Sequence, residues 1–476
     1  MVPSPGLARS TGSPRSWLDR LWTSIADRGR AYAPVPEASI PAVERARQLA
    51  HSLLSESGEA SGAAIARDLL STLRDLTPDD RALFQRFLAD GFAPEAATLR
   101  AAADAYITDP TPDRAMRLFN AAEPPRQELL RRMNMAPGGT QALVEMRREL
   151  LGRLRRDPVL RPLDNDLRHL FASWFNRGFL ELRRIDWYTP AAILEKLITY
   201  EAVHEIEGWP DLRRRLAPDR RCFAFFHQAL PGEPLIFVEV ALVRGIAASV
   251  QPLLALDPAE PPVKPEAADT AIFYSISNCQ EGLRGVSFGN FLIKQVVEEL
   301  KVELPNLVQF STLSPVPGFR AWLERQLADE TASDAATRAL LAGIADNDDW
   351  LQDSARAEAL SGPLLHACAE YLTLPHGGKG ATDPVARFHL GNGARLERIN
   401  WLGNTARRGL RESYGIMVNY LYDRDTIEAN HEAFVRHGAV ARSRGVDALL
   451  APPGGSGRPR GPGKPRGLLP LPRRRV

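Results

Sequence analysis

The stretch TAIFYSISNCQEGLRGVSFGNFLIKQVVEELKVELPNLVQFST, residues 270–312, decides the fold. Residues 270–277 form a β-branched and aromatic run that is typical of a strand. A glycine-containing segment follows, and the apolar positions of residues 288–301 then predict a helix. Residues 307–312 predict the next strand. The order of strand, helix and strand predicts a mixed α/β region.

Neighbouring segments extend this mixed region in both directions. Residues 221–229 and 234–243 are strand-like runs, and the Leu-Pro-Gly-Glu sequence between them predicts a hairpin. A helix is expected to begin after Thr189-Pro190, and another over residues 319–327. Residues 333–374 predict a helical insertion, whereas residues 419–422 predict a late strand.

The N-terminal part of the chain carries helical signals almost throughout, from about residue 17 to residue 179. Thr77-Pro78-Asp79-Asp80 combines a hydroxyl cap, a proline at the first helical position and acidic residues in the first turn. Thr111-Pro112-Asp113 repeats this pattern. Residues 164–176 place large apolar side chains along one helical face. Such faces form either the core of the helical region or a subunit interface.

Length and these patterns together predict an α+β protein of two domains, because 476 residues exceed one ordinary core. We expect an all-helical domain over residues 15–185 and a mixed α/β catalytic domain over residues 186–440. Residues 1–14 predict a disordered N-terminus. Residues 441–476 are dominated by Pro, Gly and Arg, which predicts a disordered tail.

The charge distribution argues against nucleic-acid binding. The formal net charge is +2, but residues 441–476 contain nine Lys or Arg and one Asp, so the remaining chain carries −6. No apolar run reaches the ~20 residues of a membrane span. The arginine-containing start has no apolar segment, so an unstructured terminus is favoured over a mitochondrial presequence. Cys222, Cys279 and Cys368 lack metal-ligand spacing, which predicts no metal site and fits a reducing cytoplasm.

The most informative segment runs over Arg284, Gly285, Val286, Ser287, Phe288, Gly289 and Asn290, between a predicted strand and a predicted helix. Small residues let the backbone approach a ligand, and the helix that follows points its free N–H groups and its dipole at the same place. The segment resembles the acyl-CoA loop of GCN5-related N-acetyltransferases. It also matches the G-x-S-x-G nucleophile elbow, although Ser287 lies about nine residues after the strand end. A plain glycine-rich turn is the third interpretation.

Two further segments carry candidate catalytic groups. Ser314 leaves the next strand in Ser-Pro-Val-Pro-Gly-Phe, where two prolines fix the turn. His389 precedes a Gly-Asn-Gly turn that leaves room for a ligand. His204 is a weaker candidate, for which a helical setting and a packing role are expected. From the residues alone, a capping serine and a structural histidine are the favoured interpretations, and catalytic roles are the alternative.

The motifs in this order resemble the malonyl-CoA decarboxylase family. They are RRCFAFFHQALPGEPLIFVEVAL, YSISNCQEGLRGVSFGNFLIKQVVEEL, FSTLSPVPGF, FHLGNGARLERINWLG and GIMVNYLY. The resemblance covers about residues 185–422. It implies a catalytic domain similar to the GCN5-related N-acetyltransferase (GNAT) fold, behind a helical oligomerisation domain that forms a homotetramer.

The resemblance also implies site residues. Ser314 and His389 correspond to the catalytic serine and histidine, and residues 284–290 to the acyl-CoA phosphate loop. Tyr422 corresponds to a tyrosine near the active site, with Asn392 and His204 as supporting residues. Some family members have Glu where this chain has Ser287, so that carboxylate's role does not transfer. The chain also lacks the Ser-Lys-Leu terminus of some relatives.

The implied reaction converts malonyl-CoA to acetyl-CoA and CO2 through an enolate, a carboxy-lyase reaction of fatty acid metabolism. Such a step needs donors at the thioester oxygen and a proton for carbon, and no metal or cofactor. His389 and Ser314 are expected to polarise the thioester, with His389 relaying the proton. The rival functions are an acyl-CoA N-acyltransferase, a thioesterase that uses Ser287, and a non-enzymatic scaffold.

Overall fold

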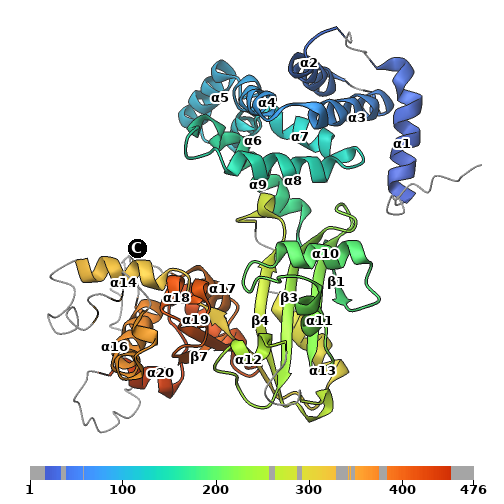
Figure 1. Ribbon diagram of the computed structural model, residues 1–476. Coiled ribbons are helices and arrows are strands. Elements are labelled where there is room, and N and C mark those ends of the chain that lie inside the picture. Colours follow the sequence, from blue (N-terminus) through green and yellow to red (C-terminus); the bar gives the residue numbers. More distant parts are fainter. Residues whose placement is uncertain are drawn as a thin grey trace, which may run out of the picture. The chain divides into compact units, whose positions relative to one another are not determined.

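The computed structural model describes residues 17–33, 39–56, 58–256, 263–286, 292–328, 341, 344, 349–374 and 383–451. Contacts divide the chain into two compact units, Met1–Ser311 and Thr312–Val476, which are described separately (Figure 1). The predicted disordered start, residues 1–14, lies outside the described residues. In the part of the chain that the structure describes, no helix is both long and apolar enough to cross a membrane.

The first unit begins with nine α-helices among its described residues. They are α1 (Trp17–Gly29), α2 (Ala42–Ser55), α3 (Glu59–Asp75), α4 (Pro78–Gly91), α5 (Ala96–Thr108), α6 (Pro112–Ala122), α7 (Pro125–Met135), α8 (Gly139–Leu151) and α9 (Arg161–Trp174). The predicted caps are present, because Thr77 accepts a hydrogen bond from Asp80 N and Thr111 accepts one from Arg114 N. Prediction of a helical N-terminal region is therefore confirmed.

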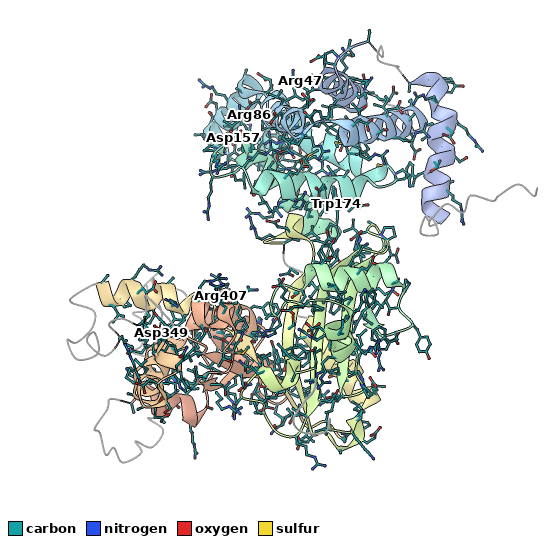
Figure 2. The ribbon with its side chains drawn as sticks, in the orientation of Figure 1. Arg47, Arg86, Asp157, Trp174, Asp349 and Arg407 are labelled. Atoms are coloured by element: carbon teal, nitrogen blue, oxygen red, sulfur yellow. The ribbon has the colours of Figure 1, made fainter. Side chains whose placement is uncertain are left out.

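Most helices of this region share an apolar core, but α5 and α6 contribute no buried residue to it. Leu69, Phe84 and Leu167 belong to an apolar core shared by several helices. The ion pair between Arg86 and Asp157, 2.6 Å, joins α4 to the segment before α9 (Figure 2). Helices α5 and α6 pack on each other and contain no buried residue.

Four antiparallel strands follow in the same unit: β1 (Leu180–Ile185), β2 (Arg220–His227), β3 (Pro234–Val243) and β4 (Thr270–Asn278). The predicted hairpin is confirmed as β2–β3. Helices α10 (Ala191–Tyr200), α11 (Trp209–Arg215), α12 (Gln251–Leu254) and α13 (Leu292–Glu303) accompany the sheet, and β5 (Gln309–Thr312) runs to the unit boundary. Figure 1 shows α10 and α11 against this sheet.

Strand β1 corrects the sequence analysis. Residues 180–185 were assigned to the helical domain 15–185, but they pair along β2, with Ile185 opposite Cys222. The sequence Leu-Glu-Leu-Arg-Arg-Ile is mostly exposed, so it lacks the continuous apolar signal of a buried strand. Pairing with β2 supplies the hydrogen bonds that make this segment extended.

The described residues of the second unit form three short strands and several helices. Strand β8 (Met417–Leu421) pairs antiparallel with β6 (Ser314–Pro315) and with β7 (Arg395–Asn400). The helices are α14 (Phe319–Ala328), α16 (Ser354–Thr373), α17 (Pro384–Gly391), α18 (Arg407–Ser413), α19 (Ile427–His437) and α20 (Arg444–Leu449). Strand β7 was not predicted. A helical region followed by a mixed sheet-and-helix region, as predicted, is confirmed.

The start of the predicted disordered tail is ordered, which corrects the boundary at residue 441. Arg442 forms a parallel bridge with Leu396, and α20 follows with Val446 buried at 1% exposure. Burying this single apolar side chain and capping the helix with Ser443 are sufficient to fix a short element. Residues 452–476, and residues 333–340 of the predicted helical insertion, lie outside the described residues.

Candidate active site

Ser314 lies in the second unit, at the first position of the short strand β6. It pairs with Val418 of the central strand and is 6% exposed. Its Oγ lies 2.9 Å from Thr312 Oγ1 and 3.2 Å from His389 Nε2. Strand pairing therefore fixes the backbone, and two polar neighbours fix the hydroxyl.

His389 comes from the last turn of helix α17, and Leu390 separates it from the Gly-Asn-Gly turn. Asp383 caps the start of this helix by accepting hydrogen bonds from Val385 N and Ala386 N. The turn requires glycine at Gly393, where φ is 85° and a Cβ would lie 2.0 Å from Ile427 O. The capped helix and the tight turn together hold the imidazole in place.

Tyr422 and Asn392 complete the cluster. Tyr422 Oη lies 2.8 Å from His389 Nδ1, and Asn392 hydrogen-bonds to the same phenol. The Tyr420 ring stacks on the imidazole with centroids 4.7 Å apart and planes 22° from parallel. The structure thus brings together Ser314, His389, Asn392 and Tyr422 from three separate parts of the sequence.

The cluster is buried, and the hydrogen bonds described above join neutral groups. Burial lowers the pKa of His389 to about 3. Burial also raises the pKa of Tyr422 well above its usual value, although the Asn392 hydrogen bond opposes that rise. The imidazole and the phenol are therefore both neutral near pH 7.

Hydrogen-bond directions around the imidazole follow from its neighbours. Ser314 Oγ donates its one hydrogen to Thr312 Oγ1, so it accepts at its contact with His389 Nε2. A neutral imidazole has one N–H, so Nδ1 is the acceptor and Tyr422 Oη is the donor. This tautomer is assigned from the network. In this tautomer, His389 Nε2–H donates to Ser314 Oγ, and the Ser314 hydroxyl donates to Thr312 Oγ1.

The outer partners agree with this direction. Tyr420 N donates to Thr312 Oγ1 at 3.1 Å, and Asn392 donates to the Tyr422 oxygen. Asn392 Oδ1 is buried without a hydrogen-bond partner among the described residues. Thr312 and Tyr420 lie inside the motifs FSTLSPVPGF and GIMVNYLY, but neither was assigned a role from the sequence.

The predicted acyl-CoA loop belongs to the first unit. Of its residues, Arg284, Gly285 and Val286 are described, whereas Ser287, Phe288, Gly289 and Asn290 lie outside the described residues. Gly285 has φ of 78°, which glycine adopts without strain. The Arg284 side chain is 63% exposed, and its Nη1 lies 3.6 Å from Glu281 Oε1.

Helix α8 supports the approach to this loop. Arg147 donates to Gly282 O at 2.7 Å and to Arg284 O at 2.9 Å, and its Nε lies 2.8 Å from Asp164 Oδ1. A Cβ on Gly282 would lie 2.0 Å from Val144 O, so only glycine permits this close contact. No local sequence signal predicts this support, because Arg147 is 135 residues from Gly282.

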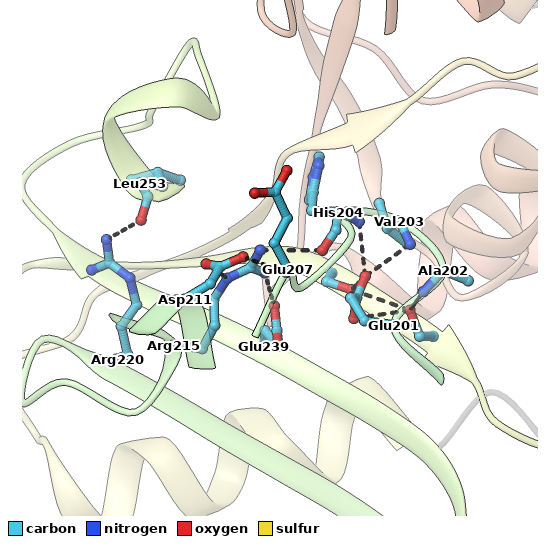
Figure 3. Close-up of polar contacts among 12 residues, drawn as sticks. Glu201, Ala202, Val203, His204, Glu207, Asp211, Arg215, Arg220, Glu239 and Leu253 are labelled. Carbon is cyan, nitrogen blue, oxygen red and sulfur yellow. Dashed lines mark hydrogen bonds and ion pairs between the residues drawn. The ribbon is translucent and has the colours of Figure 1, made fainter. Parts of the chain in front are cut away.

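His204 corrects another expectation, because it lies in a segment after α10 and not in a helix. Glu201 anchors this segment by accepting from Val203 N, His204 N and the Ser275 hydroxyl (Figure 3). His204 O accepts a hydrogen bond from the buried Arg215, which also pairs with Glu239 at 2.6 Å. His204 is therefore part of a buried polar cluster in the first unit.

Other reactive side chains show no metal-binding arrangement in the part of the chain that is described. Cys222, Cys279 and Cys368 are buried and unpaired. Burial raises the pKa of each of these thiols. Groups of three or more His, Cys, Asp or Glu that could hold a metal ion are absent from the described residues.

Comparisons with known proteins identify the relatives of this chain. A family model described as the malonyl-CoA decarboxylase C-terminal domain matches residues 178–457, and one described as the N-terminal domain matches residues 92–175. The crystal structure of malonyl-CoA decarboxylase from Rhodopseudomonas palustris is 51% identical with a TM-score of 0.81. The one from Agrobacterium vitis is 52% identical with a TM-score of 0.80. Each match covers 86% of this chain and 100% of the other.

A curated relative agrees. The mitochondrial malonyl-CoA decarboxylase of the goose Anser anser anser is 39% identical over 336 residues, which are 66% of this chain and 66% of the goose protein. The chain is thus a member of the carboxy-lyases, enzymes that break a carbon–carbon bond to a carboxylate. Within that class, it belongs to the malonyl-CoA decarboxylase family.

Proposed function

We propose that this chain converts malonyl-CoA to acetyl-CoA and CO2, and that Ser314 and His389 carry the reaction. The observation that supports these roles best is the direction of the hydrogen-bond chain. Tyr422 donates to His389 Nδ1, and Nε2–H donates to the Ser314 hydroxyl. Decarboxylation of a thioester needs hydrogen-bond donors near the thioester oxygen, which gains negative charge. The hydrogen bonds from Tyr422 through His389 to Ser314 supply such donors.

The reaction breaks the bond between the carboxylate carbon and Cα of the malonyl group. CO2 leaves, and the bonding electrons remain on Cα and the thioester oxygen as an enolate. The Ser314 hydroxyl turns from Thr312 Oγ1 to the enolate oxygen and donates to it, while His389 Nε2–H continues to donate to Ser314 Oγ. His389 or Ser314 then passes a proton to Cα, which forms the new C–H bond. One proton from solvent restores the donor in each turnover.

A neutral imidazole suits this role. Burial lowers the pKa of His389 to about 3, so the ring is uncharged over the physiological range. A charged imidazolium could attract the malonyl carboxylate and stabilise the ground state, which would oppose the loss of CO2. An uncharged donor gains strength as the enolate charge develops. Its hydrogen bond is therefore stronger in the transition state than in the ground state.

The same network argues against Ser314 as a nucleophile. A hydrolytic serine donates its hydrogen to histidine, and a carboxylate orients that histidine. Here the serine hydrogen is directed to Thr312, and a phenol contacts His389 Nδ1. The thioesterase alternative therefore rests on Ser287 alone.

Four supporting features belong to the same proposal. Tyr422 and Asn392 orient His389, and residues 284–290 bind the phosphates of CoA. Arg147 supports this loop through Gly282 and Arg284. His204 supports the sheet next to β4 through the Glu201 cluster. We expect the reaction to need no metal or organic cofactor, because hydrogen-bond donors supply the stabilisation of the enolate.

We also propose that the chain forms a homo-oligomer, a tetramer, through its helical region. Ile107, Met116 and Phe119 on α5 and α6 are 77%, 61% and 71% exposed. An unburied amphipathic helical pair is a surface that a second copy can cover. Because the proposed reaction consumes malonyl-CoA, we assign the chain to fatty acid metabolism. Three unpaired cysteines favour the reducing cytoplasm as its location, which cell fractionation can test.

The test is a product profile from purified protein and malonyl-CoA, measuring CO2, acetyl-CoA and free thiol together. Equal amounts of CO2 and acetyl-CoA, without free thiol, are expected. His389→Asn should lower kcat by ~10²–10⁴-fold with little change in CoA affinity. Free thiol without CO2 would favour the thioesterase, and CoA release that depends on an added amine would favour the acyltransferase. Either result would overturn the proposal.

A further inference from the structure

A cavity of about 350 Å³ lies in the first unit, where β1 ends, β2 begins and α11 ends. Four arginines line it: Arg184, Arg213, Arg220 and Arg221. Asp186 is the single acidic residue among its lining side chains. Its size falls within the range of small-molecule sites. A cavity with four guanidinium groups in its wall calls for an explanation.

The carboxylates near this cavity do not balance the arginines. Glu303 alone is shared by Arg184, at 3.0 Å, and Arg221, at 2.7 Å. Asp219 alone is shared by Arg214, at 2.7 Å, and Arg220, at 2.6 Å. With Arg213 and Asp186 included, five guanidinium groups face three carboxylates. The local excess of positive charge favours an anion.

Two of these arginines retain unused donors. Arg220 is 3% exposed, and its Nε is buried without a hydrogen-bond partner among the described residues. Its other nitrogens are directed at Asp219 and at Leu253 O, the second of which Figure 3 shows. Arg213 is exposed, and no ion pair or side-chain hydrogen bond is assigned to it within the described part. The buried Arg220 Nε is costly without a partner, and a ligand oxygen would satisfy it, whereas the exposed Arg213 is available to a ligand from the solvent side.

The remaining wall of the cavity is apolar. Ile185 and Cys222, paired across β1 and β2, are 3% and 1% exposed, and Leu216 lies beside them. Trp187 lines the same cavity with 47% of its surface exposed. An exposed tryptophan beside arginines can stack on a flat ligand group. The wall therefore suits a ligand with both an anionic and an apolar, planar part.

This cavity is distinct from the predicted acyl-CoA loop. Arg220 pairs with Ala241, which pairs with Ile272 near the start of β4. The acyl-CoA loop follows the other end of β4, after Asn278. Along β4, Ile272 and Asn278 are six residues apart, which corresponds to roughly 20 Å of strand. A CoA phosphate bound at residues 284–286, the part of the loop that the structure describes, would therefore lie beyond the opposite end of this strand.

We propose that this cavity is a second ligand site, remote from the acyl-CoA loop, which binds an organic phosphate with a planar apolar group. Phosphate is favoured over carboxylate because its three oxygens can accept from several guanidinium groups in different directions. Arg184 and Arg213 bind the phosphate at the mouth of the cavity. Trp187 and the apolar wall contact the planar group.

The test is calorimetric titration of the full chain with phenyl phosphate and with inorganic phosphate, at constant ionic strength in chloride. Phenyl phosphate is expected to bind more tightly than inorganic phosphate. Arg213→Gln should weaken its binding roughly tenfold or more. Arg213 makes no assigned side-chain contact, so this variant should fold normally, and Arg184→Gln gives a second measure. Arg100→Gln removes an exposed arginine of α5 as the matched control.

Three results would overturn the proposal. Unchanged binding in both Arg184→Gln and Arg213→Gln would remove the phosphate site from this cavity. Loss of binding in Arg284→Gln alone would assign the phosphate to the acyl-CoA loop. Equal affinity for the two probes would show that the apolar wall does not contribute.

Discussion

Replacing His389 should make the second unit less sensitive to acid. The folded protein holds this imidazole with a pKa of about 3, whereas an exposed histidine titrates near 6.5. Between these values the unfolded chain binds a proton that the folded chain does not bind. Stability must therefore fall as the pH falls from about 6.5 toward 3.

The size of this effect follows from the two pKa values. From pH 7 to pH 5 the unfolded state gains about 2 kcal/mol from protonating this one residue, since each pH unit below 6.5 contributes about 1.4 kcal/mol. His389→Asn has no such group. The variant should therefore lose about 2 kcal/mol less stability than the wild type over this interval, whatever its stability at pH 7.

The assay is urea unfolding at pH 7, 6 and 5, followed by hydrogen exchange in peptides from residues 395–421. These peptides contain β7 and β8 and report on the second unit. His437→Asn, which removes an exposed histidine of α19, is the matched control and should follow the wild type. Parallel pH dependences for wild type and His389→Asn would refute the reasoning, because His389 would then titrate alike in both states.

Three other changes test separate parts of the structure. Tyr422→Phe removes the hydroxyl that contacts His389 Nδ1 and should lower kcat roughly 10- to 100-fold, while KM stays near its original value in steady-state kinetics. Gly282→Ala places a methyl group 2.0 Å from Val144 O, so it should weaken CoA binding in calorimetry and cost about 1–3 kcal/mol of stability; normal values for both would contradict the support of the loop by α8. Phe119→Asp charges the exposed face of α6 and should dissociate the oligomer in light scattering, and an unchanged mass would exclude this face from the interface.

Local sequence determined the elements whose signals are local. Thr77 and Thr111 each precede a proline and an acidic residue, and each caps a helix as predicted. The turn between residues 229 and 234 likewise fixed the β2–β3 hairpin. Where the signal was weak the prediction failed, as in β1 and β7, because charged, half-exposed strands are defined by their partners and not by their own apolar pattern.

The sequence alone also selected Ser314, His389 and Tyr422, through their motifs. Only the tertiary structure decided how they act together. His389 is 75 residues from Ser314 and 33 from Tyr422. The direction of their hydrogen bonds depends on burial and on Thr312, whose Oγ1 accepts from Tyr420 N, 108 residues away in the sequence. Protonation and hydrogen-bond direction are properties of the surroundings, because desolvation and neighbouring donors set them. For this reason the sequence named the groups that we propose to react, and burial in the fold keeps the imidazole of His389 neutral.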